Sequence, residues 1–343
     1  MSFVSLFQHR AGYIGGGVLN RILSDGKAAD FQITVLIRDA AKARKLEPFG
    51  VKTVVGSLED TDELTALAGE ADLVFNCADA DNIQPTKAIL AGLRKRHQST
   101  GRVPSLIHTG RSIGVLADDA TGMYLTETVY SDDDVDPLYK LPITAPHQEV
   151  NKAILEADQE GYIRSYLVLP PAVWGLAQGP LVDAHIMNPQ SQEIPALIIA
   201  SIDRGRPGMV GEGKNVWSNV HIDDAVLLYE LIWNAILGGE EIGHGSQGYY
   251  FPENGEHQLY DVSKAIGAGL KDLRLVEDPE PSSFTTEELD KYFDGVSILL
   301  SLGSNSRCRG QRARAIGWNP RKTTGDMLAS IKPEIQYMLS RAS

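Results

Sequence analysis

The most constraining feature of this sequence is a glycine-rich turn between an apolar run and a helical pattern near the start of the chain. Residues 3–7 have the composition of a short strand, residues 18–23 have helical spacing, and Gly12 and three glycines at 15–17 lie between them. Glycine lets a backbone approach a bound group closely, and a helix N-terminus offers free N–H groups and a partial positive charge. This order predicts a pyrophosphate-binding turn of the kind that begins a dinucleotide-binding fold.

Strand-like and helical stretches alternate along the rest of the chain. Apolar runs at 31–37, 51–55, 71–78, 105–109, 164–169 and 249–251 predict strands, and helical patterns occur at 61–67, 83–97 and 148–160. Such alternation predicts an α/β fold with a Rossmann-like, doubly wound parallel sheet. We expect residues 1–176, with about 215–255, to form the cofactor domain. Residues 177–214 and 256–343 should form a smaller C-terminal substrate lobe, with the site in the crevice between the two.

Composition excludes several classes of protein. A net charge of −13 argues against direct nucleic-acid binding and against an anionic membrane surface. The sequence has no apolar run near the roughly 18 residues of a membrane span and no signal-peptide pattern at its start. Cys77 and Cys308 are its two cysteines, which suggests neither a disulfide framework nor a metal site. We therefore expect a cytoplasmic protein that binds a small molecule and no metal, with a homodimer or protein partner as further options.

Several segments resemble one known family. Gly12-Tyr13-Ile14-Gly15 resembles the second half of the Thr-Gly-x-x-Gly-Tyr-Ile-Gly turn of extended and atypical short-chain dehydrogenases/reductases, including the NmrA-like group. Residues 170–175, 219–225 and 317–320 are similar to later family segments. In this register His9 occupies the place of the family's first glycine. That departure implies either a different loop path or weaker phosphate binding.

The resemblance implies a set of cofactor-binding positions. The family's turn would use Gly12, Tyr13, Ile14 and Gly15 at the pyrophosphate. Ser57 stands where the family usually has an aspartate at the adenine, with Leu58 beside it. Small Ala78 ends a strand over which the cofactor would lie, and Pro170 and Val173 would lie near the nicotinamide.

The end of the second strand predicts which dinucleotide binds. An NAD site places a carboxylate about 20 residues past the glycines, at the ribose 2′-hydroxyl. Here Arg38 occupies the strand tip, followed by Lys42, Arg44 and Lys45. A guanidinium with nearby ammonium groups suits a 2′-phosphate, so NADP is favoured over NAD. NAD is the alternative, because Asp39 is a carboxylate next to the strand tip and because the basic residues could simply form a solvated start of a helix.

The family's catalytic pair is only half present. Its members carry a tyrosine four residues before a lysine on one helix face. Lys152 is present, but Gln148 stands at the tyrosine position and cannot give up a proton. His147 titrates in the right range and is our first candidate for the proton donor, with Tyr139 of the preceding loop as the second. A capping or surface role for His147 remains equally open.

A hydroxyl after the fifth strand is expected to hydrogen-bond the substrate carbonyl. In the family a serine or threonine at this point has that role, which implies Ser112 first and Thr109 second. The alternative for each is a turn hydroxyl that bonds its own backbone.

Three functions fit these observations. The first is an NADP-dependent oxidoreductase acting on a small carbonyl or hydroxyl compound, supported by Lys152 and the extra lobe. The second is a non-catalytic dinucleotide sensor of the NmrA-like type, supported by Gln148 and His9. The third is a redox-neutral isomerase or lyase on the same fold. Because fold alone does not decide function, the sequence favours the first only slightly.

Overall fold

A parallel sheet organises the molecule. The computed structural model describes residues 2–6, 12–24, 30–293 and 301–342. Its main sheet has the strand order β11-β7-β5-β4-β1-β2-β3, and every neighbouring pair is parallel. The strands are β1 (Ser2–Leu6), β2 (Gln32–Ile37), β3 (Lys52–Val55), β4 (Leu73–Asn76), β5 (Ser105–Thr109), β7 (Arg164–Val168) and β11 (Tyr249–Tyr250). The predicted doubly wound α/β class is confirmed.

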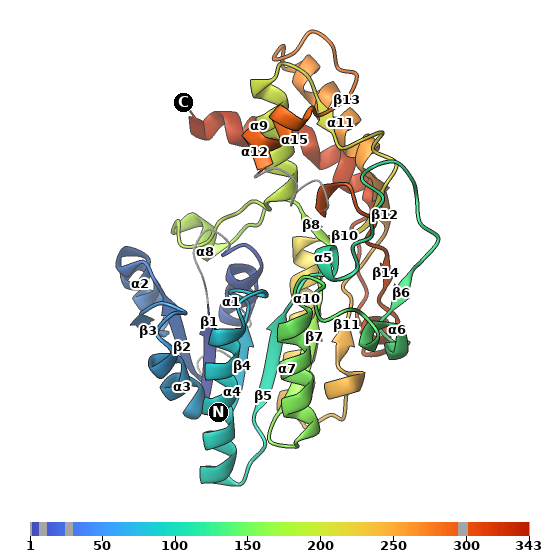
Figure 1. Cartoon of the computed structure of the whole chain (residues 1–343). Helices are drawn as coiled ribbons and strands as arrows, with labels where there is room; N and C mark the ends of the chain where they lie inside the picture. Colours follow the sequence, from blue (N-terminus) through green and yellow to red (C-terminus); the bar gives the residue numbers. More distant parts are fainter. Residues whose placement is uncertain (1, 7–11, 25–29, 294–300, 343) are drawn as a thin grey trace.

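Two layers of helices cover the sheet (Figure 1). One core joins the sheet to α1 (Ile14–Ser24), α2 (Ala40–Leu46) and α10 (Ile222–Gly238). A second joins it to α3 (Thr61–Gly69), α4 (Ile83–Thr100) and α7 (Gln148–Gln159). Because both faces are covered, central strands such as β4 and β5 are buried at every residue, which explains their continuous apolar runs.

Gly92 allows helices α3 and α4 to pack closely against each other. A Cβ on Gly92 of α4 would lie 2.4 Å from the carbonyl oxygen of Thr65 in α3, so the two helices can pack this closely only without that side chain.

A separate lobe lies above the carboxyl ends of the strands (Figure 1). Its core includes residues of β8 (Ala172–Trp174), β10 (Val216–His221), α9 (Glu193–Asp203), α11 (Leu259–Asp272), α12 (Thr286–Phe293) and α15 (Thr324–Ala342). Strands β8 and β10 form a small sheet with β12 (Glu256–Gln258). Another two-stranded sheet pairs β9 (Gly208–Met209) with β13 (Ser282–Ser283).

Short elements make the remaining connections. They are η2 (Glu47–Phe49), α5 (Ser112–Val115), β6 (Tyr130–Ser131), α6 (Val135–Tyr139), α8 (Pro180–Asp183), η3 (Gly245–Gln247), β14 (Cys308–Arg309) and α14 (Gln311–Ala315). Strands β6 and β14 pair in parallel and so join the long loop after β5 to the C-terminal part of the chain. No described helix is both long and apolar enough to cross a membrane.

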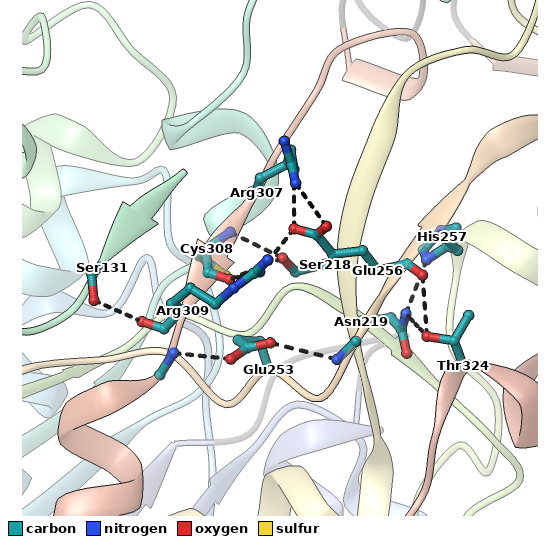
Figure 2. A network of polar contacts seen from close by, with 12 residues as sticks. Ser131, Ser218, Asn219, Glu253, Glu256, His257, Arg307, Cys308, Arg309 and Thr324 are labelled. Atoms are coloured by element: carbon teal, nitrogen blue, oxygen red, sulfur yellow. Dashed lines mark hydrogen bonds and ion pairs between the residues drawn. The ribbon is translucent and has the colours of Figure 1, made fainter. Parts of the chain in front are cut away.

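A polar network holds the C-terminal segment against the lobe. Figure 2 shows Glu256 between Arg307 and Arg309. Arg307 donates two hydrogen bonds to the Glu256 carboxylate, of 3.0 and 2.9 Å, and Arg309 donates one of 2.8 Å. Beside them, the Cys308 N–H donates to Ser218 Oγ at 2.9 Å. Paired charges with several hydrogen bonds are the form in which ionic groups tolerate burial, so this network can fix the chain path within the protein.

Asp132 gives a second attachment for this segment. Its carboxylate is fully buried and accepts backbone N–H bonds from Phe251 at 3.0 Å, Arg312 at 2.8 Å and Ala313 at 3.4 Å. One side chain thus joins the loop after β5, the end of β11 and the start of α14.

We predict that Asp132→Ala lowers the free energy of unfolding by roughly 2–4 kcal/mol, because it leaves three N–H groups without their acceptor. Chemical denaturation followed by circular dichroism measures the change. The control is Asp134→Ala, which removes an exposed carboxylate that makes no capping hydrogen bond. Equal stability of the two variants would contradict this role for Asp132.

Candidate functional site

A pocket of about 220 Å³ opens where β1 and β4 send their connections to opposite faces of the sheet. This is the switch point at which doubly wound sheets bind ligands. The lining comes from the turn before α1, the loops after β4 and β5, the segment after β7 and the start of the lobe. Its residues are Tyr13, Ile14, Cys77, Ala78, Asp79, Ala80, Asp81, Thr109, Gly110, Arg111, Pro170, Pro171, Val173, Asn188, Gln190, Ser191, Gln192 and Glu193.

The glycine turn meets the pocket through Tyr13 and Ile14. The Tyr13 hydroxyl donates a 2.6 Å hydrogen bond to the carbonyl of Gly175, which ties the turn to the segment after β8. A Cβ on Gly16 would lie 2.6 Å from Met187 Cβ, so the start of the lobe packs directly on α1. The first-turn N–H groups of α1 have no acceptor within the helix and suit a phosphate. His9 lies outside the described residues.

These features fit a dinucleotide. Among the predicted cofactor positions, Tyr13, Ile14, Ala78, Pro170 and Val173 line the pocket together. They come from three separate parts of the chain, and Ala78 leaves space at the end of β4.

The other predicted cofactor positions lie outside the pocket lining. Arg38 is exposed at the end of β2. Ser57 makes local bonds: its N–H donates to Asp60 at 2.9 Å and its hydroxyl accepts from the Glu59 N–H at 3.2 Å. Leu58 is buried in the core beneath α3. Their roles toward a cofactor remain predictions.

Thr109 lines the floor of the pocket, but its hydroxyl already has partners. It donates to Cys77 Sγ at 3.2 Å and lies 2.8 Å from the hydroxyl of Tyr229 in α10. Since the Thr109 proton points to sulfur, the hydroxyl can offer a ligand an acceptor more readily than a donor. Burial raises the pKa of Cys77 to about 11, so this thiol is protonated and inert at neutral pH.

Asp81, which lines the pocket, pairs with His147 behind it. Imidazole Nδ1 lies 2.7 Å from a carboxylate oxygen of Asp81, within ion-pair range though without the alignment of a full hydrogen bond. The His147 side chain is 6% exposed and that of Asp81 is 67% exposed, so one partner is buried and the other faces the pocket. Contact with His147 lowers the pKa of Asp81, which stays ionised.

His147 occupies an unusual backbone position. It precedes α7 with φ of 70°, a left-handed conformation that costs energy for a residue with a side chain. The imidazole packs on the chain near Gly114, where a Cβ would lie 3.0 Å from Nε2. The local fold therefore holds the ring in one place, facing Asp81.

Of the predicted catalytic residues, Thr109 lines the pocket, whereas His147, Lys152 and Ser112 lie outside its lining. Lys152 is partly buried on α7, and Gln148 of the same helix is buried and donates to the Leu138 carbonyl at 3.2 Å. Ser112 is fully buried, and its hydroxyl has no hydrogen-bond partner among the described residues. The helix position at which the family has its tyrosine is thus occupied by Gln148, whose side chain makes an internal hydrogen bond.

Tyr139 ends α6 and is 41% exposed, and its hydroxyl contacts Ser246 of η3. The carbonyl of the preceding residue, Leu138, accepts a hydrogen bond from Gln148 at the start of α7. Tyr139 is not among the residues that line the pocket, and its catalytic role stays a prediction.

Several site residues were not found from the sequence. Arg111 and Glu193 form an ion pair of 2.5 Å between the loop after β5 and the start of α9. Gln190 contacts buried Glu334 of α15. The helical spacing in α15 could have predicted that Glu334 is buried, because this acid shares a helix face with buried Met327 and Ile331. The described residues contain no group of His, Cys, Asp and Glu side chains suited to a metal.

Comparisons with known proteins agree with this geometry. Residues 11–136 match the NAD(P)H-binding family. The chain is 28% identical over 327 residues to the oxidase ucsJ of Acremonium sp, covering 90% of each chain. It is 23% identical over 264 residues to a 4-hydroxy-2-methyl-3-oxo-4-farnesyl-3,4-dihydroquinoline-1-oxide ketoreductase of Stigmatella aurantiaca, covering 73% of this chain and 68% of that protein.

Solved structures show the same fold at low identity. UDP-glucose 4-epimerase of Thermotoga maritima, solved with UDP-glucose, matches with a TM-score of 0.65 and 14% identity over 100% of both chains. A dTDP-glucose 4,6-dehydratase of Bacillus anthracis, in complex with NAD, matches with a TM-score of 0.64 and 13% identity, covering 99% of this chain and 97% of that one.

Glu334 should make stability depend on pH. Burial raises its pKa from 4.5 to about 7, so between these values the folded state holds a proton that the unfolded state has lost. The contribution of Glu334 to stability is therefore fully present below pH 4.5 and is lost as pH rises through 7, by up to roughly 3 kcal/mol. Because Glu334→Gln cannot titrate, its stability relative to the wild type should increase between pH 5 and 8 in urea denaturation. Parallel pH profiles would contradict the prediction.

Proposed function

We propose that this chain, whose NAD(P)-binding domain stands on the fold of the extended short-chain dehydrogenases/reductases, is an NADP-dependent oxidoreductase acting on a small carbonyl or hydroxyl compound. The observation that carries the proposal is the meeting of the glycine turn with Asp81 at one pocket, where buried His147 contacts Asp81 from behind the lining. The turn can hold a dinucleotide, and the pair of Asp81 and His147 can hold a proton. A carbonyl reductase needs both.

The proposed division of labour follows from the pocket lining. Tyr13 and Ile14 would hold the pyrophosphate, and Pro170 and Val173 would flank the nicotinamide, which supplies hydride when bound. Reduction builds negative charge on the substrate oxygen, so a proton must reach it. His147 would hold that proton at Nδ1, which faces the Asp81 carboxylate, and Asp81, the member of the pair that lines the pocket, would take the proton from the imidazole and pass it to the substrate oxygen.

Preference for NADP is supported by the position of Asp39. Its carboxylate caps α2, accepting the N–H groups of Ala41 at 2.8 Å and Lys42 at 3.2 Å, and these bonds lower its pKa. Asp39 is thus engaged with its own helix and is a poor partner for a ribose hydroxyl. Exposed Arg38 stands next to it, in a position to meet a 2′-phosphate.

We predict that NADPH binds more tightly than NADH and that Arg38→Ala removes most of this preference, because the guanidinium contact to the 2′-phosphate is lost. Isothermal calorimetry with both cofactors measures it. Arg321→Ala, which removes an exposed arginine away from the end of β2, is the matched control for loss of one positive charge. Equal affinities of the unmodified protein for the two cofactors would refute the preference.

We predict that His147→Phe lowers turnover by roughly a hundredfold or more at unchanged NADPH affinity, in keeping with general-acid contributions. The assay follows NADPH oxidation with a panel of aldehydes and ketones. Tyr139→Phe is the control, since its hydroxyl contacts Ser246 and not the pocket. Normal turnover of His147→Phe would remove His147 from the mechanism.

A non-catalytic dinucleotide sensor is the second candidate. It is favoured by Gln148, which fills the place of the family's tyrosine and bonds the Leu138 carbonyl. If NADPH binds but no compound of the panel oxidises it, this second function is the better account. A redox-neutral isomerase or lyase would instead convert its substrate without net change in NADPH.

A further inference from the structure

A buried carboxyl group lies behind the lobe side of the pocket. Glu334 of α15 is 1% exposed, and its Oε2 has no hydrogen-bond partner among the described residues. Its other oxygen, Oε1, accepts a 3.5 Å hydrogen bond from the side-chain amide of Gln190, which lines the pocket. Burying a carboxyl group that makes only one hydrogen bond costs free energy. The partner in that bond, Gln190, therefore indicates which side chain the acid acts on.

The backbone around Gln190 is held independently of Glu334. Asn188 accepts the Gln190 N–H at 3.2 Å and donates its own amide to the Gln190 carbonyl at 3.0 Å. The Pro189 carbonyl also accepts the Ala177 N–H at 2.8 Å. The backbone of this loop is therefore set without the acid. What Glu334 adds is a constraint on the side chain of Gln190.

We propose that Glu334 is a positioning residue that draws the amide nitrogen of Gln190 away from the pocket, leaving the amide oxygen to select a substrate with a hydroxyl or N–H donor. This inference rests on the proposed function of the pocket as a substrate site. A glutamine amide has one donor end and one acceptor end. Engaging the nitrogen with Oε1 of Glu334, which can accept in the protonated as well as the ionised form of the acid, decides which end a ligand meets.

The rest of the pocket lining, like the amide oxygen of Gln190, offers mainly hydrogen-bond acceptors. Three carboxylates line the pocket, those of Asp79, Asp81 and Glu193. Arg111 is the one positive side chain among the described lining residues, and it is already paired with Glu193. A wall rich in acceptors favours ligands that donate hydrogen bonds and disfavours ethers or carboxylates of the same shape.

The experiment compares two probes that differ in one donor. Cyclohexanol and cyclohexyl methyl ether are tested separately at millimolar concentration by saturation-transfer NMR on the full chain, with and without NADPH. We expect the alcohol to give about a fivefold stronger effect, in line with the worth of one hydrogen bond. Glu334→Leu and Gln190→Leu should bring the two probes to equality, whereas Glu334→Gln should keep the preference, since its amide can still accept from Gln190.

Control variants distinguish the loss of Gln190 positioning from a general disruption of the fold. Gln336→Leu changes an exposed residue of the same helix and should keep the wild-type preference. Melting curves identify any variant that fails to fold. If Glu334→Leu is one of them, Gln190→Leu carries the test, because its side chain is only partly buried.

The proposal is overturned by equal signals from both probes on the wild type, by no signal from either, or by a preference that survives both leucine variants. Failure of the proposed function has a different signature. In that case NADPH does not bind in calorimetry, while the alcohol preference and its loss in the leucine variants can still be measured on the chain without cofactor.

Discussion

The parallel hydrogen bonding of the main sheet is the constraint on which the rest of the structure depends. Parallel strands put all their carboxyl ends at one edge, so the loops after β1, β4, β5 and β7 must meet there. Register adds detail: Asn76 pairs with His108, and Thr109 pairs with Val168, which brings the loops that follow to the same level. Because the connections after β1 and β4 leave to opposite faces, a crevice remains between them, and the pocket occupies it.

The lobe completes the pocket because buried carboxylates hold the C-terminal part of the chain in place. Asp132 and Glu256 bind backbone N–H groups and guanidinium groups of residues 307–313. From there the chain continues into α15, which packs on α11 in the lobe core and carries Glu334 to the pocket wall. Groups almost 150 residues apart in sequence, Gln190 and Glu334, thus come into contact.

The start of helix α7 differs from that in the family the sequence resembles. There a tyrosine on the helix face is followed by a lysine one turn later. Here the corresponding helix uses Gln148 for an internal contact, and the imidazole of His147 lies one residue earlier, at the helix start. The left-handed backbone at His147 turns its ring toward the loop after β4, where Asp81 lies 2.7 Å away.

The sequence by itself determined the α/β class and most strand positions, because burial on both faces leaves continuous apolar runs of strand length. It also placed Tyr13, Ile14, Ala78, Thr109, Pro170 and Val173 among the candidate site residues, and these line the pocket. The roles of Arg38 and His147 stay predictions. The sequence could not identify Asp81, Gln190 or Glu334, since each is defined by a partner distant in sequence. Local pattern determines which elements form, whereas tertiary contacts decide which side chains meet, because those contacts depend on packing between segments that no local pattern relates.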